Sequence, residues 1–284
     1  MLTRAGSSLV ELLVALGLAA VLLAAATGSM LRQQRSARWV GAFGAVESQA
    51  THAVRLLPDE LALLDAAAGD VASGQASDST LELRAVVASA VACDSATNVV
   101  TLAPDAGTLP PLGGISRTIA AGDSLWFLDS LGWRARGVLA ASRVTSGCLR
   151  PATPSAATTR LALDGAMDVG GGTPLRVTRH ERWLFYRASD GRWYLGFRDW
   201  NVAGARFNAT QPVAGPFVKA LRTGARTGFR FYDSLGNALM PDGTNEGGIA
   251  RVRVTALSTV AAYGVVDTVR RDSADAVLAR RGVQ

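Results

Sequence analysis

An apolar run near the start of the chain constrains the fold more than any other feature. The segment from Leu9 to Leu31 contains one charged residue, Glu11. A helix of about 23 residues, at about 1.5 Å per residue, is about 34 Å long, which is enough to cross the hydrocarbon core of a bilayer. An ionised carboxylate inside such a helix costs about 2.5–3.5 kcal/mol. The run therefore predicts a membrane-length helix in which Glu11 requires a partner.

The residues around Glu11 form a recognisable motif. Residues 6–16 read Gly-Ser-Ser-Leu-Val-Glu-Leu-Leu-Val-Ala-Leu, which resembles the cleavage and methylation motif of type IV pilins and type II secretion pseudopilins. The resemblance implies that a prepilin peptidase cuts after Gly6 and methylates the new amino terminus at Ser7. It also implies that Glu11 forms an intersubunit ion pair with the terminal amine of a neighbouring subunit. The chain departs from the family at Ser7, where Phe or Met is usual.

The apolar pattern continues beyond the membrane-length segment, but with a helical period. Apolar residues recur at steps of three and four, which predicts an amphipathic helix with one apolar face; they are Val40, Phe43, Val46, Ala50, Ala53, Val54 and Leu57. Pro58 is expected to end the helix, because proline cannot continue the hydrogen-bond ladder.

After this helix the pattern changes to a period of two, which is typical of strands. Alternating segments that flank turn residues predict two hairpins, with strands at 125–129 and 133–138 and at 181–187 and 192–198. Leu81 to Val87 also alternates. We therefore expect an antiparallel β-rich head.

Two later segments extend the resemblance to the other end of the chain. A Phe-x-Phe-Tyr-Asp strand begins at Phe229, and an alternating strand runs from Ile249 to Leu257. Their order is similar to the C-terminal half of PilW/PulJ-type minor pilins, whereas residues 70–175 resemble no family. The expected fold is α+β and pilin-like, with a leader at 1–6, a membrane or filament-core helix at 7–31, an amphipathic half at 32–58 and a head at 59–284.

The resemblance implies a function, a set of partners and a location. The chain would be a non-enzymatic minor pilin or pseudopilin that helps to assemble or initiate a type IV pilus or a type II secretion pseudopilus. Its partners would be the prepilin peptidase, other minor and major pilins, an inner-membrane assembly platform protein and the membrane before assembly. It would be single-pass in the inner membrane with a periplasmic head, and then part of the filament.

Composition narrows the remaining functional classes. The net charge is +6, but the arginines are scattered rather than gathered on one stripe, so no nucleic-acid partner is expected. No nucleophile or acid–base constellation is visible, and we expect neither enzymatic activity nor a cofactor. Oxygen ligands at Asp242, Thr244 and Glu246 leave a weak calcium possibility; no other metal site is expected.

The cysteine count suggests one covalent link in the head. The chain has two cysteines, Cys93 and Cys148, and in an exported protein an isolated pair favours a disulfide over two buried thiols. Such a bond would stabilise the fold by about 4 kcal/mol in the chain-entropy model.

Two alternatives remain open from the sequence. The first is an ordinary signal peptide, with its cleavage site at residues 24–26, on a secreted or anchored β-rich binding module. A carbohydrate-stacking face could then be formed by Trp183, Trp193 and Trp200, although core packing or a subunit interface is favoured for them. The second is a plain single-span anchor. The positive-inside rule alone would then place the head in the cytoplasm, because one arginine, Arg4, precedes the span and three follow it at positions 32, 35 and 38.

Overall fold

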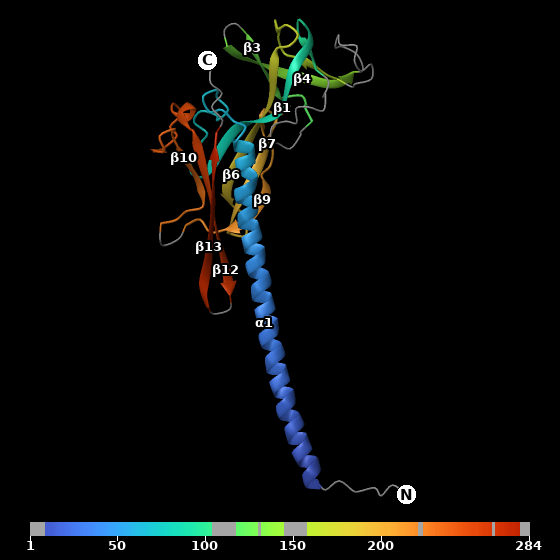
Figure 1. Cartoon of the computed structure of the whole chain (residues 1–284), viewed down its shortest axis with the longest axis vertical. Coiled ribbons are helices and arrows are strands. Elements are labelled where there is room, and N and C mark those ends of the chain that lie inside the picture. Colours follow the sequence, from blue (N-terminus) through green and yellow to red (C-terminus); the bar gives the residue numbers. More distant parts are fainter. Residues whose placement is uncertain are drawn as a thin grey trace.

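The protein is a long helix that carries a β-rich head at its C-terminal end (Figure 1). The computed structural model describes residues 9–103, 118–129, 132–144, 158–220, 224–262 and 265–278. The helix, α1, runs from Leu9 to Leu61 without interruption over 53 residues. A long helix followed by antiparallel strands confirms the expected α+β class.

The expectation that Pro58 ends the helix is wrong. Helix α1 continues to Leu61, so Pro58 lies in its last turn, where the missing N–H removes one hydrogen bond. The carbonyl of Pro58 still accepts a hydrogen bond from the backbone N–H of Ala62 at 2.9 Å. Leu57 and Leu61 on either side are fully buried. Each leucine gains about 1.5–3 kcal/mol by burial, which offsets the lost bond.

The described part of the head contains thirteen strands in two sheets. The first sheet contains β1 (Thr80–Ala96), β2 (Val99–Leu102), β3 (Ser124–Asp129), β4 (Gly132–Val144), β5 (Thr158–Leu163), β6 (Pro174–Arg187), β7 (Trp193–Asn201), β8 (Arg206–Phe207) and β9 (Gln211–Phe217). The second contains β10 (Gly228–Tyr232), β11 (Ala238–Leu239), β12 (Arg251–Ala262) and β13 (Val265–Val277), with a short 3₁₀ helix, η1 (Glu246–Gly248), before β12.

The first sheet closes on itself at the end farthest from the helix. Its order is β1-β2-β5-β4-β3-β6, and β6 pairs again with β1, so six strands form a small antiparallel barrel. All six strands contribute apolar side chains to one separate core. Examples are Val87 from β1, Phe127 from β3 and Leu161 from β5. This barrel occupies much of residues 70–175, which resemble no family.

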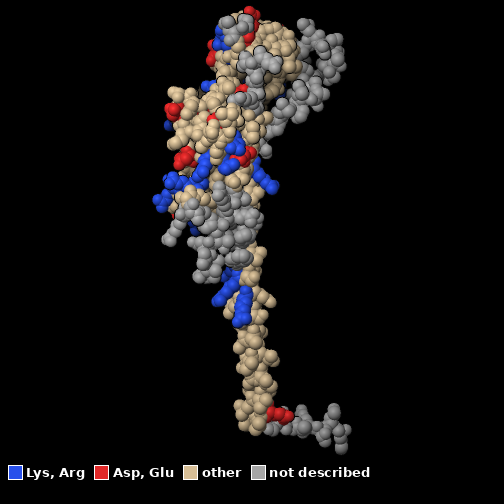
Figure 2. Space-filling view, turned by 60° about the vertical axis from the view of Figure 1, so that its left-hand side comes forward, with Lys and Arg blue, Asp and Glu red and all other residues tan. Residues whose placement is uncertain are grey.

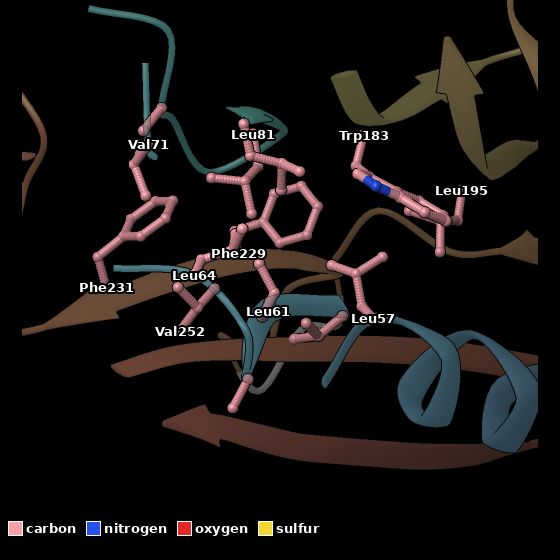
Figure 3. Packing of buried hydrophobic residues seen from close by; sticks show 14 of the residues in the cluster. Leu57, Leu61, Leu64, Val71, Leu81, Trp183, Leu195, Phe229, Phe231 and Val252 are labelled. Atoms are coloured by element: carbon pink, nitrogen blue, oxygen red, sulfur yellow. The ribbon is translucent and has the colours of Figure 1, made fainter. Parts of the chain in front are cut away.

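Strands β1 and β6 continue out of the barrel toward the helix. There β6 pairs with β7, and β7 pairs with β9. The inward residues of these strands, the end of α1 and the second sheet share the larger core. Figure 3 shows Leu57, Leu61 and Leu64 of the helical end between Trp183 and Leu195 on one side and Val252 on the other. The end of α1 is therefore inserted into the core of the head rather than laid on its surface.

A polar belt separates the two cores. Glu181 on β6 and Asp123 before β3 are both almost completely buried. Arg179 donates from Nε and Nη2 to the two carboxylate oxygens of Asp123, at 2.7 and 2.9 Å. A bidentate pair of this kind is directional, so it holds the start of β3 beside β6.

One close backbone approach joins the second sheet to the first. The N–H of Phe229 on β10 donates to the carbonyl of Asp78 at 2.8 Å. The neighbouring Gly228 has φ +153, and a Cβ there would lie 2.2 Å from the same carbonyl oxygen. Glycine is therefore required at this junction.

Several strands match the sequence expectations, whereas β5, β8, β9, β11 and β13 are not among them. The two predicted hairpins are confirmed as β3–β4 and β6–β7. Strand β1 is longer than predicted and runs on to Ala96, past a register shift between Val86 and Ala88. Strand β13 was not predicted. It pairs with β12 over almost its whole length, but its charged residues obscure the alternation that identifies a strand.

Candidate functional site

Among the described residues, most of the exposed large apolar side chains lie on the N-terminal part of α1. The span from Leu9 to Arg38 is long and apolar enough to cross a membrane, and none of it is buried by the rest of the chain. Twelve large apolar side chains between Leu9 and Leu31 are about half exposed or more. These residues are 49–78% exposed. At about 1.5–3 kcal/mol for a fully exposed side chain, leaving them in water costs on the order of 10–20 kcal/mol. This surface therefore requires a lipid or protein environment.

Glu11 lies in the first turn of this exposed helix. A carboxylate is favoured there, because the first turn lies at the positive end of the helix dipole. The side chain is exposed on the helix surface. Gly6 and Ser7, the predicted cleavage and methylation residues, lie outside the described residues.

The helix enters the head next to a shallow cavity. This cavity has a volume of about 290 Å³ and lies between α1 and strand β9. Ser48 and His52 line it from the helix, and Tyr194 with residues 212–215 lines it from the sheet. Ala53, one residue further on, is already fully buried. Of the expected apolar face, Ala53, Val54 and Leu57 are thus buried and Val40 is exposed. The side chains of Phe43, Val46 and Ala50 are not among those that the structure describes.

One member of the predicted disulfide can be placed in the structure. Cys93 lies on β1, in the part of the strand that belongs to the barrel, and it is disulfide-bonded. Cys148 lies outside the described residues, so the pairing of these two cysteines stays a prediction.

The proposed calcium ligands hold the local turn together. Asp242 Oδ1 accepts hydrogen bonds from the backbone N–H and the hydroxyl of Thr244, at 2.9 and 2.8 Å. The first of these bonds is the main reason that the pKa of Asp242 is lowered. Glu246 is buried, and its Oε1 accepts from the N–H groups of Gly74 and Gly243 at 2.9 and 2.8 Å. These oxygens thus tie two loops together, and no group of three His, Cys, Asp or Glu residues in the described ranges is arranged to hold a metal.

The three tryptophans considered for carbohydrate stacking do not share a face. Trp183 is buried in the larger core, and Trp193 packs against that core. Lys219 Nζ lies 4.6 Å from the centroid of the Trp193 ring. Trp200 belongs to a different cluster, in which its ring lies 5.2 Å from His180 and 5.0 Å from Phe207.

That cluster is a feature that the sequence did not reveal. It lies on the outer face of β1, β6 and β7, defined as the face opposite the helix, and comprises Glu82, His180, Arg182, Trp200 and Phe207. Arg182 Nε donates to Glu82 Oε2 at 2.8 Å, and its guanidinium lies 4.2 Å from the Phe207 centroid. Burial lowers the pKa of His180, although the neighbouring Glu82 opposes this shift. Glu82 and Arg182 are about 100 residues apart along the chain. The β1–β6 register sets them opposite each other and so brings them together.

Comparisons with known proteins identify no relative. No family model, no curated protein and no solved structure matches the chain. Function must therefore be inferred from the exposed helix, its motif and the head that it carries.

Proposed function

We propose that this chain is a minor pilin or pseudopilin, a structural subunit that helps to assemble or initiate a type IV pilus or a type II secretion pseudopilus. The observation that carries the proposal is the bare apolar helix with Glu11 in its first turn. The Gly6-Ser7 motif directly before it supports the same reading.

The proposed mechanism begins in the inner membrane. The precursor is held there by α1 with the head in the periplasm. Prepilin peptidase hydrolyses the peptide bond after Gly6 and methylates the amine of Ser7. The helix then leaves the bilayer for a bundle of similar helices contributed by other pilins, with the help of the assembly platform protein. Its apolar side chains remain out of water at every stage, which the cost of exposing them requires.

Glu11 acts in the proposed filament as an electrostatic guide. A carboxylate buried among apolar helices is costly when unpaired, and the terminal amine of a neighbour supplies the opposite charge. Only a register that joins the two charges removes this cost. The pair therefore favours one axial position of a subunit relative to its neighbour.

The head supplies the surface of the subunit. The end of α1 is inserted between its sheets, so a force on the helix is carried directly into the head. We propose that the head makes subunit contacts and performs no catalysis.

Mass spectrometry of the mature amino terminus tests processing. The proposal requires a chain that begins with methylated Ser7 in cells with prepilin peptidase and an uncleaved chain in cells without it. A mature chain that begins at Thr27 would show an ordinary signal peptide and contradict the proposal.

A variant of the helix tests the role of Glu11. Glu11→Ala should still insert into the membrane but should lose incorporation into filaments and co-purification with other pilins, whereas Val14→Ala on the same helix should retain both. Normal incorporation of Glu11→Ala would remove the ion pair from the mechanism.

A further inference from the structure

Three arginines form a compact group on α1 directly after its apolar segment. Arg32, Arg35 and Arg38 are all exposed, and Figure 2 shows basic side chains on the helix just below the head. We call these three residues the arginine collar. At about 1.5 Å per residue the collar covers about 9 Å of the helix axis.

The collar occupies one side of the helix. Each residue turns the helix by about 100°, so steps of three residues place the three arginines within a sector of about 120°. The opposite side carries Gln33, Gln34 and Ala37, which are uncharged. The collar is therefore a one-sided positive strip rather than a ring.

The chain offers the collar no acidic partner nearby on the helix. The sequence has no Asp or Glu between Glu11 and Glu47, so no residue three or four positions away can form the usual helical ion pair. The ion pairs among the described residues of the head are formed by other arginines.

The position of the collar relative to the apolar segment identifies its complement. If the segment that ends at Leu31 fills the hydrocarbon core, Arg32 begins at the level of the lipid headgroups. That layer is about 5–8 Å thick on each side of a bilayer, close to the length of the collar. Guanidinium groups bind phosphate oxygens with paired hydrogen bonds, and long arginine side chains bend toward the interface.

We propose that the arginine collar binds the phosphate groups of anionic phospholipids in the leaflet on the head side of the membrane. This inference rests on the membrane-inserted state of the proposed function and does not depend on filament assembly. Binding on one side of the helix gathers anionic headgroups beside that side before the subunit is recruited. The lipid contacts must then be released when the helix leaves the bilayer.

Lipid selection by the full-length protein tests the inference. The chain is reconstituted into vesicles of phosphatidylcholine and phosphatidylglycerol in equal parts, and the lipids retained on the released protein are counted by native mass spectrometry. A basic residue near an anionic surface is worth about 1 kcal/mol, or about fivefold in binding. We expect retained phosphatidylglycerol to exceed phosphatidylcholine by at least about fivefold.

Three variants separate the collar from general charge. Arg32→Gln/Arg35→Gln/Arg38→Gln should retain the two lipids equally, and the corresponding triple lysine variant should keep most of the preference. A matched control removes three exposed arginines of the head, Arg160, Arg206 and Arg230, and should behave like the wild type. Equal selectivity in the wild type and the triple glutamine variant would overturn the inference, as would an equal loss in the head control.

Flotation of the same vesicles shows whether the protein is inserted in the membrane, so a failure of the collar inference can be told from a failure of the proposed function. A wild-type chain that floats with the vesicles but shows no lipid preference contradicts the collar alone. A wild-type chain that does not float contradicts membrane insertion, and with it both proposals.

Discussion

The buried ion pair between Asp70 and Arg176 gives the sharpest test of how the head is held together. Asp70 lies on the segment between α1 and β1, and Arg176 lies on β6; their side chains are 1% and 6% exposed. One carboxylate oxygen of Asp70 accepts both from Arg176 Nη2 and from the backbone N–H of Asp65, the latter at 2.8 Å. The pair therefore anchors the chain just after the helix to the central strand of the head.

Removal of one partner should destabilise the head far more than removal of both charges. Arg176→Met leaves the Asp70 carboxylate buried without its cation, which costs about 3–5 kcal/mol. In a head of this size that loss lowers the melting temperature by about 6–20 °C. The double variant Asp70→Asn/Arg176→Met removes both charges of this pair. The amide oxygen of the new asparagine can still accept a hydrogen bond from the backbone N–H of Asp65. We expect the double variant to recover at least about half of the loss.

Thermal unfolding of the full chain in detergent, followed by tryptophan fluorescence, measures both values. Circular dichroism at low temperature shows whether each variant is folded before the melt. A loss below about 1 kcal/mol for Arg176→Met, the size of an exposed pair, would refute the reasoning. If the double variant is as unstable as Arg176→Met, the loss in the free energy of unfolding comes from the packing of the Arg176 side chain and not from the unpaired charge of Asp70.

Two further predictions concern the core and the outer face. Leu61→Ala should destabilise the head by about 2–5 kcal/mol, because Leu61 is fully buried where the helix meets both sheets. The control Leu235→Ala, at a residue that is 85% exposed, should change the free energy of unfolding by less than about 0.5 kcal/mol. Similar losses for both variants would contradict the structure. Burial holds the pKa of His180 below its ordinary value of 6.5, so the imidazole binds a proton more tightly in the unfolded chain than in the folded chain. The free energy of unfolding should therefore be highest above pH 6.5, where His180 is neutral in both states, and should decrease as the pH falls below 6.5. His180→Gln should reduce this slope in denaturant titrations at several pH values, and an unchanged slope would show that other groups cause it.

The sequence predicts the long helix and the main hairpins because their signals are local. The apolar run, the three- and four-residue steps and the Asp190-Gly191 turn can each be recognised within a few residues. The end of the helix was misjudged because Leu57 and Leu61 gain burial from strands far away in the sequence. Their contribution outweighs the local cost of Pro58.

The barrel and the His180 cluster could not be predicted for a different reason. Closure depends on the pairing of β1 with both β2 and β6, and no local pattern in the sequence indicates which strand edges meet. In the sequence, Glu82 and Arg182 cannot be distinguished from ordinary charged surface residues. Only the register of β1 and β6, which sets them opposite each other, identifies them as partners. The predicted cleavage and methylation motif is the reverse case. Glu11 is conspicuous in the sequence, and the structure adds only that it is exposed in the first turn of α1.

The continuity of β1 and β6 through both layers has a mechanical consequence. The two strands pair from Thr80 opposite Leu184 to Val91 opposite Pro174, so one ribbon belongs to the barrel and to the layer that holds the helix. A pull along this ribbon loads many hydrogen bonds at once, in shear, instead of opening them one after another. The head should therefore behave as a stiff lever, in which a rotation of the helix at its base moves the barrel at the far end with little loss.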